Sequence, residues 1–131
     1  MNNTVKRYFD AFNAKHVEAM LDCLSENIKH HVNEGGLRTG KPAFAAFCAH
    51  MNRCYDETLT NIVIFDAPDH ARAAAEYVVN GTYLSTDEGL PEATGQKYCL
   101  PAGSFFEVQD GLITRVTTRY NLSDWIRQIS A

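Results

Sequence analysis

The stretch of sequence that decides the fold is YCLPAGSFFEVQDGLITRVTTRY, residues 98–120. Two β-rich runs, Tyr98 to Gln109 and Leu112 to Tyr120, flank the pair Asp110-Gly111. An Asp-Gly pair between two such runs is a strong signal for a tight hairpin, because both residues accept a positive φ. The sequence therefore predicts two long antiparallel strands joined by a two-residue turn.

Alternation within these two strands indicates which side chains turn inward, because successive side chains of a strand point to opposite faces. In the first strand one row is nearly apolar, with Ser104 as its polar exception: Tyr98, Leu100, Ala102, Ser104, Phe106 and Val108. In the second strand the favoured inner row is Thr114, Val116, Thr118 and Tyr120. Small and amphipathic residues in these rows leave room for a cavity.

The chain before this hairpin begins with helical spacing and continues with β-rich runs. Apolar residues at helical spacing predict two short helices, one with Val5, Tyr8, Phe9 and Phe12, the next with Val17, Met20, Leu21 and Leu24. A third helix is expected from Pro42 to Tyr55. Strands are expected over residues 28–33, 58–65 and 71–84, and a loop over 85–97. This order predicts an α+β fold, with helices on one face of a mostly antiparallel sheet.

Composition excludes several classes of protein. The 131 residues, of which 45% are hydrophobic and 21% charged, fit a single domain over 1–131. A net charge of −4 argues against a nucleic-acid partner, and no apolar run is long enough for a membrane. Because the first residues also lack the apolar centre of a signal peptide, we expect a cytoplasmic location. The four cysteines form no Cys-x-x-Cys pair, and we expect reduced structural thiols.

The polar cluster His30-His31, with Asn33 and Glu34 close behind, is the strongest candidate for chemistry. An imidazole titrates near pH ~6.5 and can act as a general base. On a strand His30 and His31 point in opposite directions, so one of them at most enters a cavity. The residues alone leave open which one does, and whether both are ordinary strand residues.

Metal and cofactor sites are not expected. Adjacent histidines on a strand diverge, and the sequence has no His-Glu-x-x-His motif and no paired-cysteine spacing. Its glycines form neither a Gly-x-Gly-x-x-Gly fingerprint nor a phosphate-binding loop. We therefore predict no metal and no cofactor.

Several segments in order resemble the nuclear-transport-factor-2-like superfamily, and most closely its SnoaL-like, ketosteroid-isomerase-related branch. The segments are RYFDAFN (7–13), VEAM (17–20), LSENI (24–28), RTGKP (38–42) and DGLITRV (110–116). The resemblance implies a cone-shaped cystatin-like α+β barrel. In it a strongly curved, mostly antiparallel sheet wraps around three helices of the N-terminal half and a deep apolar pocket. It also implies a homodimer, to which the outward-pointing Phe105 and Cys99 would contribute.

Ketosteroid isomerase uses a carboxylate base and an oxyanion hole made of a tyrosine and a protonated aspartate. By resemblance the tyrosine falls on Tyr8, and the aspartate falls near Ser104, a weaker hydrogen-bond donor. The base falls near His31, with a one-residue ambiguity that admits Val32.

These correspondences lead to an enzyme hypothesis, in which proton transfer takes place on a small apolar carbonyl compound. His31 would be the base, and Tyr8 and Ser104 the oxyanion donors. The residues expected to line the substrate pocket are Asn33, Tyr120, Phe106 and Tyr98. A non-catalytic ligand-binding or dimerisation module with the same fold is the alternative. A third hypothesis, hydrolysis by an acidic pair, would use Glu76 and Asp22.

Overall fold

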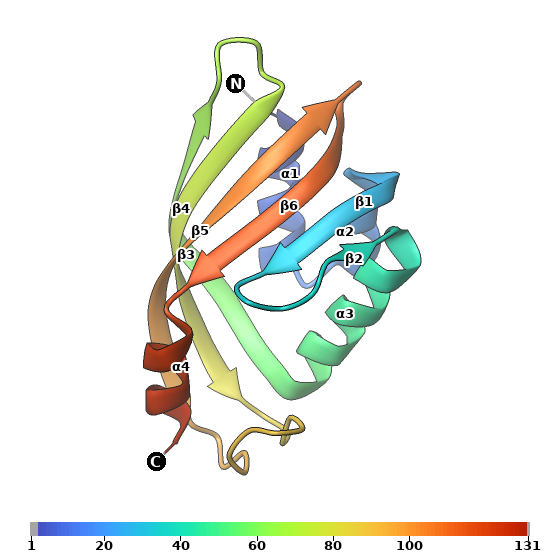
Figure 1. Ribbon diagram of the computed structural model, residues 1–131. Helices are drawn as coiled ribbons and strands as arrows, with labels where there is room; N and C mark the ends of the chain where they lie inside the picture. Colours follow the sequence, from blue (N-terminus) through green and yellow to red (C-terminus); the bar gives the residue numbers. More distant parts are fainter. Residues whose placement is uncertain (1–2, 131) are drawn as a thin grey trace.

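The computed structural model describes residues 3–130, which form four helices and six strands (Figure 1). The helices are α1 (Asn3–Asn13), α2 (Val17–Asp22), α3 (Lys41–Cys54) and α4 (Leu122–Ile129). The strands are β1 (Leu24–Val32), β2 (Arg38–Thr39), β3 (Tyr55–Asp66), β4 (Arg72–Tyr83), β5 (Lys97–Gln109) and β6 (Leu112–Tyr120). Within the described residues, no helix is both long enough and apolar enough to cross a membrane.

The strands form one curved, unclosed sheet in the order β2-β1-β6-β5-β4-β3. All neighbours are antiparallel except β1 and β6, which run parallel. Helices α1, α2 and α3 lie on one side of this sheet, and α4 follows β6 at the end of the sheet where β4 leaves for the loop to β5 (Figure 1). The predicted α+β class and the mostly antiparallel curved sheet are therefore confirmed.

The hairpin predicted from Asp110-Gly111 is present. Asp110 has φ 53° and Gly111 has φ 76°, as a tight turn between twisted strands requires. The inner row of β5 is buried from Tyr98 to Phe106, as predicted. In β6 a register shift opposite Glu107 and Val108 buries Ile113 and leaves Thr114 half-buried, so the predicted inner position of Thr114 is wrong.

Two predicted helix ends are also wrong, because the apolar residues there belong to strands. Leu24 is the first residue of β1 and Tyr55 the first of β3. Both are almost fully buried, and an apolar residue at the end of a helical stripe cannot be distinguished from the start of a buried strand. The segment after β6 forms a further helix, α4, and Asn121 caps its first turn: the Asn121 side-chain oxygen accepts a hydrogen bond from the Asp124 N–H at 3.0 Å.

Phe106 on β5 holds α1 on the sheet. It is fully buried, and its ring meets Tyr8 edge-on at 5.8 Å and Phe9 at 5.7 Å between centroids. Phe9 also meets Tyr77 of β4 at 5.3 Å. Such aromatic pairs favour edge-to-face geometry and add to the burial of apolar area. These aromatic contacts set the distance between α1 and the strands.

β3, at the edge of the sheet, is irregular in its middle. Its pairing with β4 shifts register between Thr60 and Val63. Asn61 has φ 54° there, a left-handed conformation that asparagine tolerates better than most residues. The strand therefore carries a bulge halfway along its length.

The packing of one row of residues across β3, β4 and β5 requires a glycine in its middle. Glu57 on β3, Gly81 on β4 and Tyr98 on β5 are direct neighbours in register. The Tyr98 side chain lies across β4, and its hydroxyl donates a hydrogen bond to the Glu57 carboxylate. A Cβ on Gly81 would lie 2.2 Å from Tyr98 Cζ, so no larger residue fits beneath this ring.

We expect Gly81→Ala to lower the free energy of unfolding by about 1–3 kcal/mol, the usual cost of overpacking. Gly103→Ala is the matched control, since a Cβ there would lie 3.5 Å from the Ala75 carbonyl oxygen, an ordinary contact. Urea unfolding measures both changes. In a Tyr98→Ala background the cost of Gly81→Ala should disappear, and an equal cost in both backgrounds would contradict the explanation.

The outer face of the sheet exposes two aromatic rings. Phe65, Ala74 and Phe105 are in register on three neighbouring strands, so their side chains share one face. Phe65 is 53% exposed and Phe105 49% exposed. Exposed apolar residues gathered on one face are typical of an interaction surface.

The homodimer expected from the sequence stays a prediction, and sedimentation at micromolar protein concentration tests it. The wild type should sediment as a dimer and Phe105→Glu as a monomer, because a charge would be buried at the contact. Leu37→Glu, at an exposed position in the turn after β1, should leave the dimer intact. A monomeric wild type would contradict the prediction.

Candidate active site

A cavity of about 330 Å³ lies between the sheet and the helices, and all four helices contribute residues to its wall. Most of its wall is apolar, including Phe12, Phe44, Phe47, Met51, Leu100 and Trp125. Sites for small molecules are typically of this size, mostly apolar, with a few polar groups that orient the ligand. The polar groups of this wall therefore decide what the cavity can do.

Three hydroxyl groups on neighbouring strands form a network in the cavity wall. The Ser104 Oγ of β5 lies 2.6 Å from the Tyr77 hydroxyl of β4 and 2.9 Å from the Thr118 Oγ1 of β6. All three residues line the cavity. Three hydroxyl groups carry three protons, and the two hydrogen bonds between them use two. The third proton is free to be donated to a ligand.

Burial keeps the tyrosines of this wall protonated. Burial raises the pKa of Tyr77 above its usual value, although hydrogen bonding within the hydroxyl network lowers it in part. Burial also raises the pKa of Tyr8 well above its usual value. Tyr8 lines the cavity from α1, with its ring against Phe44 and Phe106. Both tyrosines are therefore hydrogen-bond donors at neutral pH. The structure thus brings Tyr8 and Ser104, two of the predicted site residues, to one cavity.

His30 is the histidine that lines the cavity. It is 3% exposed, its ring lies 4.7 Å from the centroids of Phe44 and Phe47, and its Nδ1 is buried without a hydrogen-bond partner. Burial, and then the charges of Arg38 and His31, lower the pKa of His30 to about 4. The imidazole is therefore neutral at pH 7.

His31 points the other way. It lies on the opposite face of β1, is partly exposed and does not line the cavity, whereas Val32 does. The imidazole that was expected in the cavity at His31 is therefore supplied by His30. The reason is strand alternation: His30 shares its face with Ile28, which is fully buried.

Of the four residues expected to bind substrate, only Tyr120 lines the cavity. Asn33 joins β1 to β6 instead: its Oδ1 accepts from the Tyr120 N–H at 2.9 Å, and its carbonyl accepts from Arg119 at 2.6 Å. Phe106 is covered by α1, and Tyr98 is directed to Glu57. Glu76 and Asp22, proposed for hydrolysis, do not line the cavity either.

Sequence reasoning missed several polar residues of the wall, among them Tyr77, Glu57 and Arg38. Tyr77 shares its face of β4 with the buried Ala75 and Val79, so alternation could have found it. Burial raises the pKa of Glu57, although its hydrogen bond from Tyr98 opposes the rise. No sequence pattern indicates that Glu57 or Arg38 lines the cavity, because the residues next to each of them are of mixed polarity.

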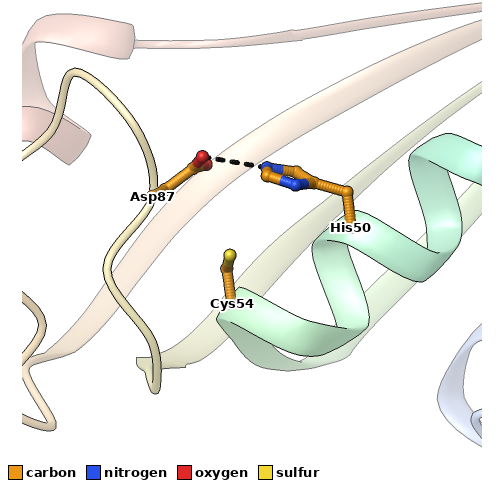
Figure 2. Close-up of side chains that lie close together, drawn as sticks. All are labelled: His50, Cys54 and Asp87. Carbon is orange, nitrogen blue, oxygen red and sulfur yellow. Dashed lines mark ion pairs between the residues drawn. The ribbon is translucent and has the colours of Figure 1, made fainter.

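A second polar group lies at the rim, where α3 meets the loop after β4 (Figure 2). His50 Nε2 is 2.9 Å from Asp87 Oδ1, and the Tyr55 hydroxyl donates to Asp87 Oδ2 at 2.6 Å. Burial raises the pKa of Asp87, but the hydrogen bonds from Tyr55 and His50 outweigh it, so the pKa lies below its usual value. Asp87 therefore fastens this loop to α3 and β3.

His50, Cys54 and Asp87 are also the group in residues 3–130 that could hold a metal ion, with ligand atoms within 4.8 Å of one another. Imidazole, thiolate and carboxylate are a donor set that zinc accepts. In the structure, however, the His50 imidazole is paired with the Asp87 carboxylate, which also accepts a hydrogen bond from the Tyr55 hydroxyl. The contacts present thus account for His50 and Asp87 as a fastening of the loop.

The chain is similar to proteins of solved structure over almost its whole length. A model of the SnoaL-like domain matches residues 5–116. A proposed polyketide cyclase of Silicibacter sp. TM1040 is 70% identical over 99% of this chain and 95% of its own, with a TM-score of 0.97. A proposed polyketide cyclase of Pseudomonas putida KT2440 is 50% identical over 98% of this chain and 97% of its own, with a TM-score of 0.97. No curated protein matches the chain. The chain belongs to the SnoaL-like family.

Proposed function

We propose that the protein is an enzyme that moves a proton at a carbon next to the carbonyl group of a largely apolar molecule. The observation that carries this proposal is the spare proton of the Tyr77–Ser104–Thr118 network, in a cavity that also holds the neutral imidazole of His30. The description of its relatives as proposed polyketide cyclases supports it, because an aldol ring closure starts with the removal of such a proton.

His30 takes the part of the base in this proposal. Its unprotonated ring nitrogen accepts the proton from carbon, and the carbonyl oxygen gains negative charge as the enolate forms. The hydroxyl network and Tyr8 donate hydrogen bonds to that oxygen. Such donors stabilise charge strongly in a site that excludes water, because they are held in place before the reaction.

The protonated imidazole then returns its proton. In an isomerase the proton goes to a second carbon of the enolate. In a cyclase the enolate carbon attacks another carbonyl group of the same molecule, and the proton goes to the alkoxide that results. Both reactions use the same residues, and the shape of the bound molecule decides between them.

Exchange of the acidic hydrogens of 2-tetralone for deuterium, followed by NMR in D₂O, tests the proposal without the natural substrate. The wild type should accelerate exchange, and His30→Gln should reduce the acceleration by about 10²-fold or more, the usual contribution of a general base. Ser104→Ala should cost about 10²-fold, as for the loss of an oxyanion donor.

His31→Gln is the matched control, because it changes the neighbouring imidazole outside the cavity. It should exchange 2-tetralone at the wild-type rate. Binding of 2-tetralone with no acceleration of exchange by the wild type would favour the non-catalytic binding module instead.

The lowered pKa of His30 also predicts a pH dependence of stability. In the unfolded chain this histidine takes up a proton near pH ~6.5, but in the folded protein only near pH 4. The unfolded state therefore binds more protons between these values, and the free energy of unfolding falls as pH drops through them, by up to about 3 kcal/mol.

His30→Phe removes this contribution, whereas His31→Phe should keep it. Urea unfolding of both variants and the wild type at about pH 7.5 and 4.5 measures the difference. An equal loss of stability in His30→Phe and in the wild type would show that His30 takes up its proton at the same pH in both states.

A further inference from the structure

Arg38 is a cavity residue that the proposed proton transfer does not use. It lies on β2, directly opposite His30 of β1 in the sheet, and it lines the cavity. Its guanidinium carbon is 4.4 Å from the centroid of the Phe47 ring. Its Nη1 is buried and has no hydrogen-bond partner. Arg38 is thus a cation held against an aromatic ring, with a donor left over.

The other charged side chains of this wall have partners. Lys15 pairs with Asp56 at 3.1 Å, Glu57 accepts a hydrogen bond from Tyr98, and Asp87 pairs with His50 at 2.9 Å. For Arg38, no carboxylate within residues 3–130 forms an ion pair.

A partly buried guanidinium without an anion is costly, because it loses hydration and gains only the weaker attraction of the ring. The charge is offset when the anion comes from a ligand. An arginine suits this role, because its planar fork can donate two parallel hydrogen bonds to one carboxylate.

We infer that Arg38 binds an ionised group of the substrate, so that the substrate is an apolar carbonyl compound that carries a carboxylate. This inference rests on the proposed function for the place of the carbonyl group. Arg38 and His30 both lie against the Phe47 ring, at 4.4 Å and 4.7 Å from its centroid. The ionised group would therefore bind beside the base and orient the carbon that loses its proton.

Binding of a carboxylate to Arg38 would also change the pKa of His30. After burial, the charge of Arg38 is the next cause that lowers the pKa of His30. A bound carboxylate offsets that charge, and its own charge favours the imidazolium form. The substrate would then raise the pKa of His30 from about 4 toward its usual value, which makes the imidazole a stronger base toward such a substrate than toward a neutral ketone.

Two probes of equal shape test the inference by calorimetry at pH 7: 2-naphthoate, which is ionised, and 2-naphthamide, which is neutral. The wild type should bind the naphthoate at least about tenfold more tightly, the factor that one charge-assisted contact supplies. Arg38→Gln should remove this preference, and Arg38→Lys should keep part of it. Lys15→Gln is the control, a second cavity cation that already has a partner, and it should keep the full preference.

NMR of the His30 ring nitrogens in the wild type gives a readout that needs no variant. Adding 2-naphthoate should raise the pKa of His30, and 2-naphthamide should leave it unchanged. Equal affinities of the two probes, no binding of either probe, or a preference that survives Arg38→Gln would each overturn the inference.

The outcomes separate this inference from the proposed function. His30→Gln should stop exchange of 2-tetralone but keep the preference for 2-naphthoate. Exchange by the wild type without any preference overturns the role of Arg38 alone. A preference without exchange overturns the proposed proton transfer and leaves Arg38 as an anion site of a binding module.

Discussion

The contact of Phe106 with Tyr8 and Phe9 is the interaction on which the rest of the structure depends. This contact fixes the distance of α1 from the middle of the curved sheet. Because the sheet is curved, side chains cannot fill the space between the sheet and the helix evenly. Beyond Phe106 the inner row of β5 continues with the smaller Ser104 and Ala102. The space that these two residues leave is part of the cavity, so the same row provides both the core and the site.

The general fold could be predicted from the sequence because its signals are local. The Asp110-Gly111 turn, the inner row of β5 and the helical stripes each depend on neighbouring residues. A local pattern also indicates which of His30 and His31 faces the cavity. Ile28, His30 and Val32 alternate with polar residues, so the apolar members of that row indicated the inward side, whereas the family resemblance pointed to the neighbouring residue.

The composition of the cavity could not be predicted in the same way. Glu57 enters it from β3 and Arg38 from a strand of two residues, and their places depend on pairings between strands far apart in the chain. Asn33 illustrates the same limit: a polar residue beside two histidines resembles a site residue. Only the pairing of β1 with β6 shows that its amide is used by the Tyr120 backbone.

The bulge at Asn61 affects how other chains can pair with the edge of this sheet. β3 is the long outer strand, and a straight strand of this kind offers a row of unpaired N–H and C=O groups to any other extended chain. The turn of the backbone at Asn61, with φ 54°, interrupts that row halfway. An interruption of this kind is one of the features by which edge strands avoid edge-to-edge aggregation.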